Sequence, residues 1–479
     1  MPEERRPYKQ TLAVLSLGAI SYSVLQSLVL PALPEIEQSL HISPGSGSWV
    51  LTAFLLSASV ITPIGGRLGD MYGKKRVLVI LITVLAVGTV VSAIASSLAV
   101  MIAGRVLQGA AGGVFPLGFG IIRDEFPPHE IAGGIGIMSS LVGIGGAAGL
   151  PLAGVLVDHL SYHWLFWIPA AAALATAVLT FFVVPESPTR APGRVNWLGG
   201  LLMAVGLTAL LVAVSQSNAW GLGSAKTLGL LLFGLVVLSA WVLTELRSAA
   251  PMIDVRMMLV RGVWTTNVVG FLVGVGLYAS MILIPSYVQE PASTGYGFEA
   301  TVLAAGLFLA PVAFTTLLMG QLAGPLERRF GSKASLVAGA AVAAVAYTLL
   351  TLAREERWEL YVASALLGAG IGLSFAAMPN LIVQNVARSQ TGVATGMNAV
   401  MRTLGGAIGA QVAAALLAGS VVAGHPSAHG YSLAFGLCAV ALVVGVGASL
   451  LVPTARRPAA PTAAAEHPEG VRPVTEPVG

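Results

Sequence analysis

GGRLGDMYGKKRV, residues 65–77, is a charged turn punctuated by glycine. It stands between two strongly apolar runs, WVLTAFLLSASVITPI before it and LVILITVLAVGTVVSAIA after it. Runs of this kind are typical of helices that cross a lipid bilayer, whose hydrocarbon core requires about 20 apolar residues in helical form. The turn is therefore predicted to connect two membrane-spanning helices.

The composition of the whole chain also indicates a membrane protein. Of its 479 residues, 56% are hydrophobic and only 10% are charged, whereas soluble domains carry about 25% charged residues. The sequence therefore predicts that lipid is the solvent for most of the surface. The 57 glycines suit helices that pack closely in lipid, and the single cysteine, Cys438, excludes a disulfide framework.

Fourteen apolar runs are long enough to span a bilayer, so we expect an all-α polytopic membrane protein. The runs lack the period-two alternation of β-barrel strands. The expected spans are 11–33, 47–65, 77–97, 99–122, 131–157, 163–184, 196–216, 226–246, 262–288, 300–323, 334–353, 358–384, 391–418 and 430–452.

Lysine and arginine are distributed unequally between the two sides of these spans. With a cytoplasmic N-terminus, 20 of them fall on the inner side and 3 on the outer side, while Arg105 and Arg402 lie inside spans. Inner loops of membrane proteins carry such an excess. The bias predicts that both termini are cytoplasmic, and it accounts for the formal charge of +4 without a nucleic-acid partner.

Three segments recur at nearly one spacing along the chain. GRLGDMYGKK begins at Gly66 and GPLERRFGSK begins at Gly324, an offset of 258 residues. LQGAAGG and LLGAGIG recur at an offset of 259, and IGGAAG (144–149) matches LGGAIG (404–409) at an offset of 260. A duplication of six spans in one orientation explains the recurrence. Spans one to six then correspond to spans nine to fourteen, and 196–246 is an inserted pair.

Glycine pairs four residues apart occur in both copies of the third segment: Gly145 with Gly149, and Gly405 with Gly409. Such pairs let helix backbones approach closely, and ordinary packing of membrane helices is the simplest interpretation for each pair alone. Because the pairs recur at matching positions, we expect the two helices to face the same kind of partner, each packing on the other's lobe.

These segments resemble the motifs of a known family. The chain resembles the major facilitator superfamily, and within it the fourteen-span drug:proton antiporters. GGRLGDMYGKKRV is similar to the superfamily's signature loop between spans two and three, GRVLQGAAGG (104–113) to its fourth-span signature, and GIGGAAGLPLAG (143–154) to its fifth-span antiporter signature. PALPEI (31–36) resembles the end of the first span in the fourteen-span branch. The resemblance covers residues 10–452.

The resemblance implies a major facilitator fold, with two six-helix lobes related by a parallel repeat plus two inserted helices, fourteen transmembrane helices in all. We expect an N-terminal lobe over 1–188, the inserted pair over 189–255, a C-terminal lobe over 256–455 and a disordered cytoplasmic tail over 456–479. The location implied is the bacterial cytoplasmic membrane, and 20 arginines against 5 lysines are typical of a GC-rich bacterium.

In this family the charged loop latches the two lobes in the outward-open state. Its acid, Asp70, is expected to pair with an arginine or a helix N-terminus across a cytoplasmic seam, and the alternative is a solvated loop that only obeys the charge rule. The residues expected to act in gating are Gly66, Asp70, Gly73, Lys74, Lys75, Arg105, Gly324, Gly331 and Lys333. Pro151 is expected to act with the glycine pairs in helix packing.

Two departures from the family pattern bear on proton coupling. Leu150 separates Gly149 from Pro151, which are adjacent in the usual antiporter signature, and Leu25 stands where the first span usually carries an acid. The candidate proton carriers are Asp70, Glu35, Asp158 and Glu290. For the last three the alternative is an outer-loop charge. We therefore expect proton dependence to be weaker than in typical relatives, or to be carried by a peripheral acid.

Arg105 and Arg402 lie inside predicted spans, where a charge is costly and therefore marks function by default. Gln108 follows Arg105 by one helical turn and Asn398 precedes Arg402 by one turn, so each pair shares a helix face. The alternative in both cases is a structural arginine that is bonded to carbonyl groups of a neighbouring helix.

A substrate pocket is expected at mid-depth between the lobes, lined by spans one, two, four and five and their repeat mates. Aromatic and methionine side chains suit an adaptable apolar site, although each one alone fits lipid contact or helix packing as well. The candidate lining residues are Tyr22, Gln26, Phe54, Arg105, Phe115, Tyr278, Phe308, Asn380, Asn398 and Arg402, with Phe375, Met378 and Met397 beside them.

Together these features predict a secondary active transporter that exports hydrophobic small molecules or drugs by alternating access in exchange for protons. Its partners would be membrane lipid, the substrate and protons. The alternatives are a uniporter or symporter of a small metabolite, a membrane enzyme and a channel. The sequence has no acid pair, Cys/His cluster or nucleophile motif of an enzyme, so no cofactor or metal is expected, and a channel would lack the duplicated latch loop.

Overall fold

The computed structural model describes residues 8–191, 195–221, 223–422 and 424–453. Within these ranges it leaves out the side chains at 30, 31, 44, 45, 144, 146–148, 150, 151, 154, 157, 158, 218 and 302. The predicted disordered tail, 456–479, lies outside the described residues.

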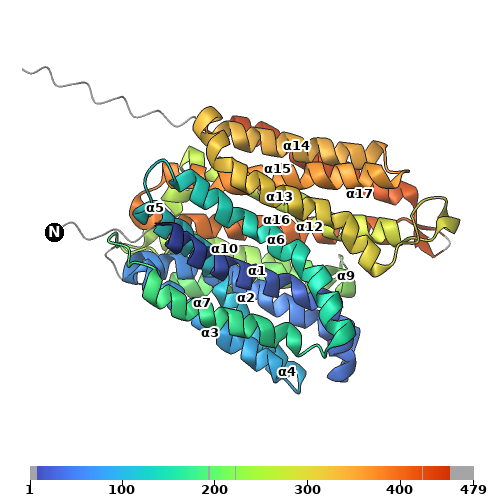
Figure 1. Ribbon diagram of the computed structural model, residues 1–479, viewed down its shortest axis with the longest axis horizontal. Coiled ribbons are helices and arrows are strands. Elements are labelled where there is room, and N and C mark those ends of the chain that lie inside the picture. Colours follow the sequence, from blue (N-terminus) through green and yellow to red (C-terminus); the bar gives the residue numbers. More distant parts are fainter. Residues whose placement is uncertain (1–7, 192–194, 222, 423, 454–479) are drawn as a thin grey trace, which may run out of the picture.

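The described chain is a bundle of long helices that run roughly side by side (Figure 1). The long helices are α1 (Tyr8–Ser39), α2 (Pro44–Tyr72), α3 (Lys74–Ala93), α4 (Leu98–Gly109), α5 (Val114–Glu125), α6 (Ile131–His159), α7 (Trp164–Val183), α8 (Trp197–Ser215), α10 (Ala225–Arg247), α12 (Arg261–Gln289), α13 (Val302–Phe330), α14 (Ser332–Leu352), α15 (Arg357–Asn385), α16 (Thr391–Ala418) and α17 (Ala428–Leu450). The short elements are α9 (Ser217–Trp220), α11 (Val255–Met258), η1 (Ala110–Gly113), η2 (Ala292–Thr294), η3 (Arg388–Gln390), β1 (Val421–Val422) and β2 (His425–Pro426).

Thirteen stretches of the described helices are long and apolar enough to cross a membrane, which confirms a multi-pass, all-helical architecture. The remaining predicted span, 131–157, coincides with α6, whose described apolar part is Ile131–Gly143. The total of fourteen spans stays a prediction. The fourth predicted span, 99–122, runs through α4, the single 3₁₀ turn η1 and α5.

Local sequence signals explain where several helices begin and end. The hydroxyl of Ser43 accepts a hydrogen bond from a backbone N–H in the first turn of α2, and Ser97 and Thr301 do the same for α4 and α13, as preferred N-cap residues do. Gly73 ends α2 with a φ of 112°, and Gly331 ends α13 with a φ of 85°. Only glycine adopts such angles without strain, so the repeated glycine of both charged loops is required by the turn between two helices.

The helices pack in two equivalent sets of six spans. The first set is α1 to α7, in which α4, η1 and α5 count as one span, and the second set is α12 to α17. In the first set α1 packs on α6, α2 on α4 and α3 on α7; in the second set α12 packs on α16, α13 on α15 and α14 on α17. Between the sets, α6 packs on α13 and α16 packs on α2. Every one of these contacts has a mate at the corresponding place in the other set, which is the arrangement that the sequence duplication predicts.

The buried apolar side chains form three clusters. One contains Leu25, Phe54 and other residues of 14–184, with Val383 from the second set of helices. Another is built largely within 269–452 around Tyr347 and Phe435. The third joins α8 and α10 to α12 and α16. The proposed domain boundaries after residues 188 and 255 stay a prediction.

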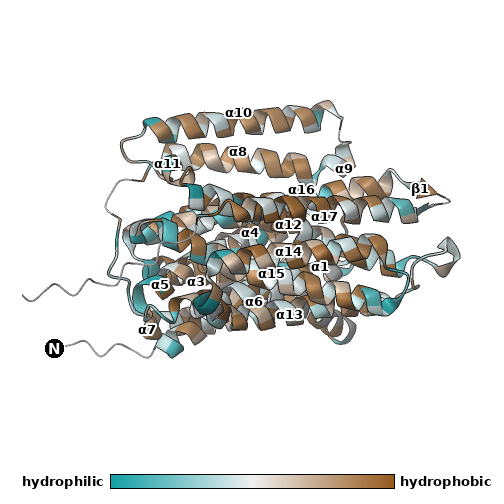
Figure 2. Cartoon of the chain, turned by 90° about the horizontal axis from the view of Figure 1, so that it is seen from above, coloured by the Kyte–Doolittle hydropathy of each residue, from teal (hydrophilic) through white to brown (hydrophobic). Residues whose placement is uncertain are grey.

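The inserted helices α8 and α10 lie as a pair beside the rest of the bundle (Figure 2). α8 packs on α2 and α16 and so covers the seam between the two sets on that side, while α10 packs mainly on α8. The outward face of α10 is apolar, with Leu232 64% exposed and Val236 59% exposed. Because lipid accepts such a face, the pair suits a membrane-embedded flank of the molecule.

Candidate functional site

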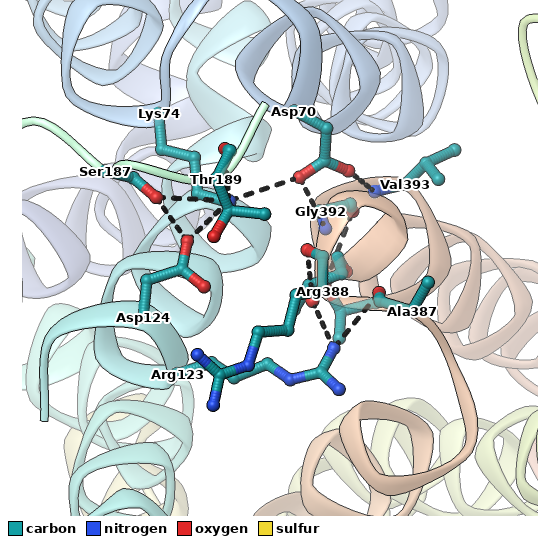
Figure 3. Close-up of polar contacts among 12 residues, drawn as sticks. Asp70, Lys74, Arg123, Asp124, Ser187, Thr189, Ala387, Arg388, Gly392 and Val393 are labelled. Carbon is teal, nitrogen blue, oxygen red and sulfur yellow. Dashed lines mark hydrogen bonds and ion pairs between the residues drawn. The ribbon is translucent and has the colours of Figure 1, made fainter. Parts of the chain in front are cut away.

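Asp70 bridges the two sets of helices at the end of the bundle where α2 finishes. Its carboxylate, which is fully buried, accepts hydrogen bonds from the backbone N–H of Gly392 (3.3 Å) and Val393 (3.1 Å) in the first turn of α16 (Figure 3). A helix N-terminus carries a partial positive charge and unpaired N–H groups, so it stabilises an anion. An acid of one set therefore caps a helix of the other set.

Lys74 lies between two acids in this site. Its Nζ is 2.7 Å from a carboxylate oxygen of Asp124 and 3.8 Å from one of Asp70, and all three side chains are almost completely buried. The Lys74 ammonium also donates to Ser187 and to the carbonyl of Thr189, in the segment after α7. A buried cation requires such partners, so this network fixes the charged loop against the end of the bundle (Figure 3).

Arg123, at the end of α5, makes the second bridge to the other set. Its guanidinium donates to the carbonyls of Val386 (2.9 Å) and Ala387 (3.1 Å) and to the hydroxyl of Thr391 (2.6 Å), all in the turn that leads into α16. Neither Arg123 nor its neighbour Asp124 was predicted from the sequence as a site residue. The available signal was a charged pair at the end of an apolar run, which the charge bias of inner loops also explains.

The second copy of the charged loop occupies the equivalent place in the second set, but it carries a cation where the first copy carries an acid. Arg328, which aligns with Asp70 in the repeat, donates to the carbonyl of His129 (3.3 Å) just before α6. The preceding acid, Glu327, is buried and accepts hydrogen bonds from Asn380 (3.3 Å) and from Ser332. Each loop thus reaches the start of a helix in the opposite set.

The first glycine of each loop sits where two helices of opposite sets touch. A Cβ on Gly66 would meet the backbone carbonyl of Gly392, and a Cβ on Gly324 would lie 2.8 Å from the Cα of Gly133. These contacts close both seams, α2 against α16 and α13 against α6, at this end of the bundle. In Figure 1 the two sets spread apart towards the opposite end.

Two other predicted gating residues lie within one set. The ammonium of Lys75 is 5.5 Å from the ring centre of Phe181 in α7, and Lys333 donates to the carbonyl of Leu450 (2.8 Å) at the end of α17. These lysines are repeat mates, and each anchors its loop to the last helix of its own set, so they take no part in the bridges across the seam.

Arg105 also acts within one set. Its guanidinium donates to the carbonyls of Val50 (3.0 Å) and Leu25 (3.4 Å) and to the amide oxygen of Gln108 (2.6 Å). The ring of Phe54 lies 4.4 Å below it. A structural role, which was the alternative to a functional one, fits this arginine, because its N–H groups donate hydrogen bonds to residues of α1, α2 and α4. Neither Arg105 nor Phe54 is among the lining residues of the central pocket between the two sets, so their place in a substrate pocket stays a prediction.

A central pocket lies between the two sets. Its lining includes five of the predicted residues and several hydroxyl groups. The lining residues are Tyr22, Gln26, Leu55, Ala58, Ser59, Thr62, Gly112, Phe115, Val142, Leu277, Tyr278, Ala399, Val400, Arg402 and Thr403. The amide of Gln26 donates to the hydroxyl of Tyr278 (3.2 Å), which joins α1 to α12 across the pocket. Asn398 and Phe375 line an adjoining pocket that shares Phe115 and Arg402.

Other predicted pocket residues lie elsewhere. Phe308 stacks on Tyr361 with 4.5 Å between ring centres, and Asn380 belongs to the cluster around Glu327. Met378 and Met397 are buried in the apolar clusters. Residues at the same expected depth in the membrane can lie on different faces of their helices and so contact different neighbours. The sequence alone does not determine which face of a span points towards the pocket.

The glycine pairs pack on helices of their own set. A Cβ on Gly145 would lie 2.7 Å from the Cα of Ser23 in α1, and one on Gly409 would lie 2.8 Å from the Cα of Val275 in α12. Gly149 and Gly405 make the equivalent approaches to the same two helices. The glycine pairs therefore face matching helices of their own sets, whereas α6 and α16 contact the opposite set through α13 and α2. The side chain of Pro151 lies outside the described residues.

The remaining candidate proton carriers lie away from the central pocket. Glu35 is partly exposed near the end of α1, and Glu290 lies 2.8 Å from the Nδ1 of His425 and accepts a hydrogen bond from Tyr431 (3.4 Å). The side chain of Asp158 lies outside the described residues. The described lining of the central pocket contains Arg402 and no carboxylate.

The chain is similar to one known family and to several of its members. The family model of the Major Facilitator Superfamily matches residues 15–410 and 266–478. The MFS-type transporter YfiU of Bacillus subtilis is 26% identical over 88% of this chain and 81% of its own length. The Tetracenomycin C resistance and export protein of Streptomyces glaucescens is 27% identical over 87% of this chain and 77% of its own length.

Two further similarities have narrower scope. The MFS-type transporter Rv1877 of Mycobacterium tuberculosis is 31% identical over 84% of this chain, but the chain spans only 58% of that protein. The crystal structure of the human organic anion transporter MFSD10 superposes with a TM-score of 0.69 over 92% of this chain and 99% of that chain. The sequence identity there is 18%, so this likeness concerns the fold alone.

Proposed function

The chain belongs to the major facilitator superfamily, a family of transporters and not of enzymes, and on that premise we propose that it exports hydrophobic small molecules or drugs across the bacterial cytoplasmic membrane by alternating access. We further propose that it has fourteen spans with both termini in the cytoplasm, and that export takes place in exchange for protons. The Tetracenomycin C resistance and export protein and the Multidrug transporter protein MdtP, at 27% and 24% identity, support export of drug-like compounds.

The observation that carries this proposal is the seam that Asp70 makes with the start of α16. It lies at the end of the bundle that the charge bias assigns to the cytoplasm, where it joins the two sets whose helices also line the central pocket. A contact that is made by one carboxylate, by the hydrogen bonds of Arg123 and by glycine-to-glycine approaches can separate without unfolding either set. A pocket between two sets that open on alternate sides is what alternating access requires.

The same contact supports proton exchange. Protonation of Asp70 removes the negative charge that the α16 N-terminus stabilises, and it leaves Lys74 with a single charged partner, Asp124. The seam is then weakened, so a proton that arrives from outside favours opening to the cytoplasm. Glu35, Asp158 and Glu290 are the other candidate carriers, and each lies at an end of a span or beside one.

The alternative is a uniporter or symporter of a small metabolite. The described lining of the central pocket lacks a carboxylate, which favours this alternative. Any coupling of the substrate to protons would then depend on acids at the ends of the helices. The two functions differ in whether the substrate and protons move in opposite directions.

Transport by the full chain in proteoliposomes tests the proposal. A panel of hydrophobic compounds is offered with and without an imposed pH gradient, and substrate and proton fluxes are followed together. Export coupled to opposite proton movement is expected. Substrate flux with no proton movement for any compound contradicts the antiport, and no flux of any hydrophobic compound contradicts the proposed export.

A further inference from the structure

The two arginines inside the spans have opposite environments. Arg105 is buried and donates to two carbonyls and one amide oxygen. Arg402 lines the central pocket, and the described residues provide it with no hydrogen bond and no ion pair. The guanidinium carbon lies 4.5 Å from the ring centre of Phe375. A charge at this depth of a membrane protein requires a partner, and Arg402 has room for one.

The surroundings of Arg402 favour an anion. The groups that line the pocket with it are the phenols of Tyr22 and Tyr278, the amide of Gln26 and the hydroxyl of Thr403, and the described lining includes no acid. Phenols and hydroxyls donate hydrogen bonds to an anion as readily as they accept them. A cationic ligand would meet the unpaired guanidinium with no carboxylate to offset it.

An apolar pocket adjoins this polar one. Phe375 lies under the guanidinium of Arg402 and also lines the apolar pocket, which shares Val142 and Leu277 with the central pocket. The other lining residues are Gly143, Ser280, Met281, Leu309, Val312, Ala313, Thr316 and Ile371. A ligand with one acidic end and one apolar end can therefore occupy both pockets at once.

We propose that Arg402 binds the acidic group of an amphipathic organic monoanion whose apolar body occupies the pocket between α6, α12, α13 and α15. This inference rests on the proposed function, because it names the class of substrate for the same transport site. The planar guanidinium presents paired donors to a carboxylate or sulfonate group. The ring of Phe375 packs against the guanidinium and also lines the apolar pocket, so it contacts both ends of the bound ligand.

Three probes with one apolar body test the inference: naphthalene-2-sulfonate, naphthalene-2-sulfonamide and (2-naphthyl)trimethylammonium, which are anionic, neutral and cationic. Their affinities for the full chain in lipid nanodiscs are measured by equilibrium binding. We expect the wild type to bind the sulfonate at least tenfold more tightly than the sulfonamide. Arg402→Gln should lose that tenfold preference and keep its sulfonamide affinity, whereas Arg402→Lys should keep part of the preference.

Lys226→Gln provides the matched control, because it removes one positive charge at an exposed site away from the pocket. Its sulfonate affinity should equal that of the wild type. An unchanged preference in Arg402→Gln, a wild type that favours the ammonium probe, or a wild type that does not bind the sulfonate overturns the inference.

A transport assay with the same probes separates this inference from the proposed function. Preferential binding of the sulfonate through Arg402 without its transport supports the inference and contradicts the export function. Transport of the sulfonamide or the ammonium probe with no preference for the sulfonate contradicts the inference and leaves the export function standing.

Discussion

At the scale of single residues, Asp70 contacts a helix that begins more than 300 residues further along the chain. The carboxylate takes the place of an N-cap for α16, which has no side-chain cap of its own. A cap of this kind stabilises a helix by about 1 kcal/mol within a chain, and here the same free energy favours the closed seam. Two-fold repetition places a cation, Arg328, at the equivalent site, so only one of the two seams is held by an acid.

Asp70→Asn should strongly impair transport while the protein still reaches the membrane. The amide lacks the charge that the α16 N-terminus favours, a loss of about 1 kcal/mol and up to ~2 kcal/mol in buried geometry. Initial rates in proteoliposomes, normalised to the protein present, measure the effect. Glu355→Gln, an exposed acid away from the seam, is the control and should keep the wild-type rate. A wild-type rate for Asp70→Asn would show that the seam does not depend on this charge.

Arg105→Lys should destabilise the protein, because a lysine cannot reproduce the fork that donates to Val50, Leu25 and Gln108. Loss of a hydrogen bond to a charged group costs about 1.5–3 kcal/mol. We expect a lower thermal midpoint in detergent and a nearly complete loss of activity. Arg402→Lys is the matched control and should leave the thermal midpoint unchanged. Equal stability and activity of Arg105→Lys and the wild type would contradict the structural role.

At the scale of elements, the sequence predicted the helices well because the apolar runs are long and several of their ends carry a glycine turn or a hydroxyl cap. It also predicted the duplication, since Gly66 and Gly324 serve the same close approach in both copies. Which face of a helix points inward could not be predicted. Asn380 and Phe308 share the expected depth with the pocket, yet they face other neighbours, because rotation of a helix about its axis is set by tertiary packing.

Gly66→Ala should prevent the closed seam, because the added Cβ would overlap the carbonyl of Gly392. The population should shift towards a conformation that is open to the cytoplasm. Modification of Ser139→Cys, in the adjoining pocket, by a membrane-impermeant thiol reagent from the cytoplasmic side measures the shift in a Cys438→Ala background. A several-fold faster reaction is expected. Gly306→Ala, whose Cβ would meet nothing within 4 Å, should leave the rate unchanged, and an unchanged rate for Gly66→Ala would contradict the role of the glycine contact.

At the scale of the whole molecule, the packing of six helices is repeated around the pocket, and α8 and α10 break the symmetry by covering only the α2–α16 seam. The equivalence of the two sets could be predicted from three short matches in the sequence. The charged network around Asp70 and Lys74 could be predicted only in part. Asp124, Arg123 and Glu327 are brought into it by contacts between segments that lie far apart in the chain.

A monoanionic substrate makes export depend on the membrane potential. Outward movement of one negative charge is favoured by about 2.3 kcal/mol per 100 mV, inside negative. In proteoliposomes that are loaded with naphthalene-2-sulfonate, an inside-negative potassium diffusion potential set by valinomycin should accelerate efflux without a pH gradient, and it should do so more strongly than for the neutral sulfonamide, whose efflux moves only the charge of the exchanged protons. Sulfonate efflux that is independent of the potential would contradict transport of the charged form.

The opening and closing of the seam between Asp70 and α16 is measured most directly as a distance between spin labels at positions 129 and 388, exposed residues in the turns before α6 and α16. Pulsed electron paramagnetic resonance on the Cys438→Ala chain in lipid should give a dominant short distance in the resting protein. A longer distance should gain population when substrate is added, and it should dominate in Asp70→Asn. One short distance under all these conditions, in a labelled protein that still transports its substrate, would contradict a cytoplasmic gate at Asp70 and α16.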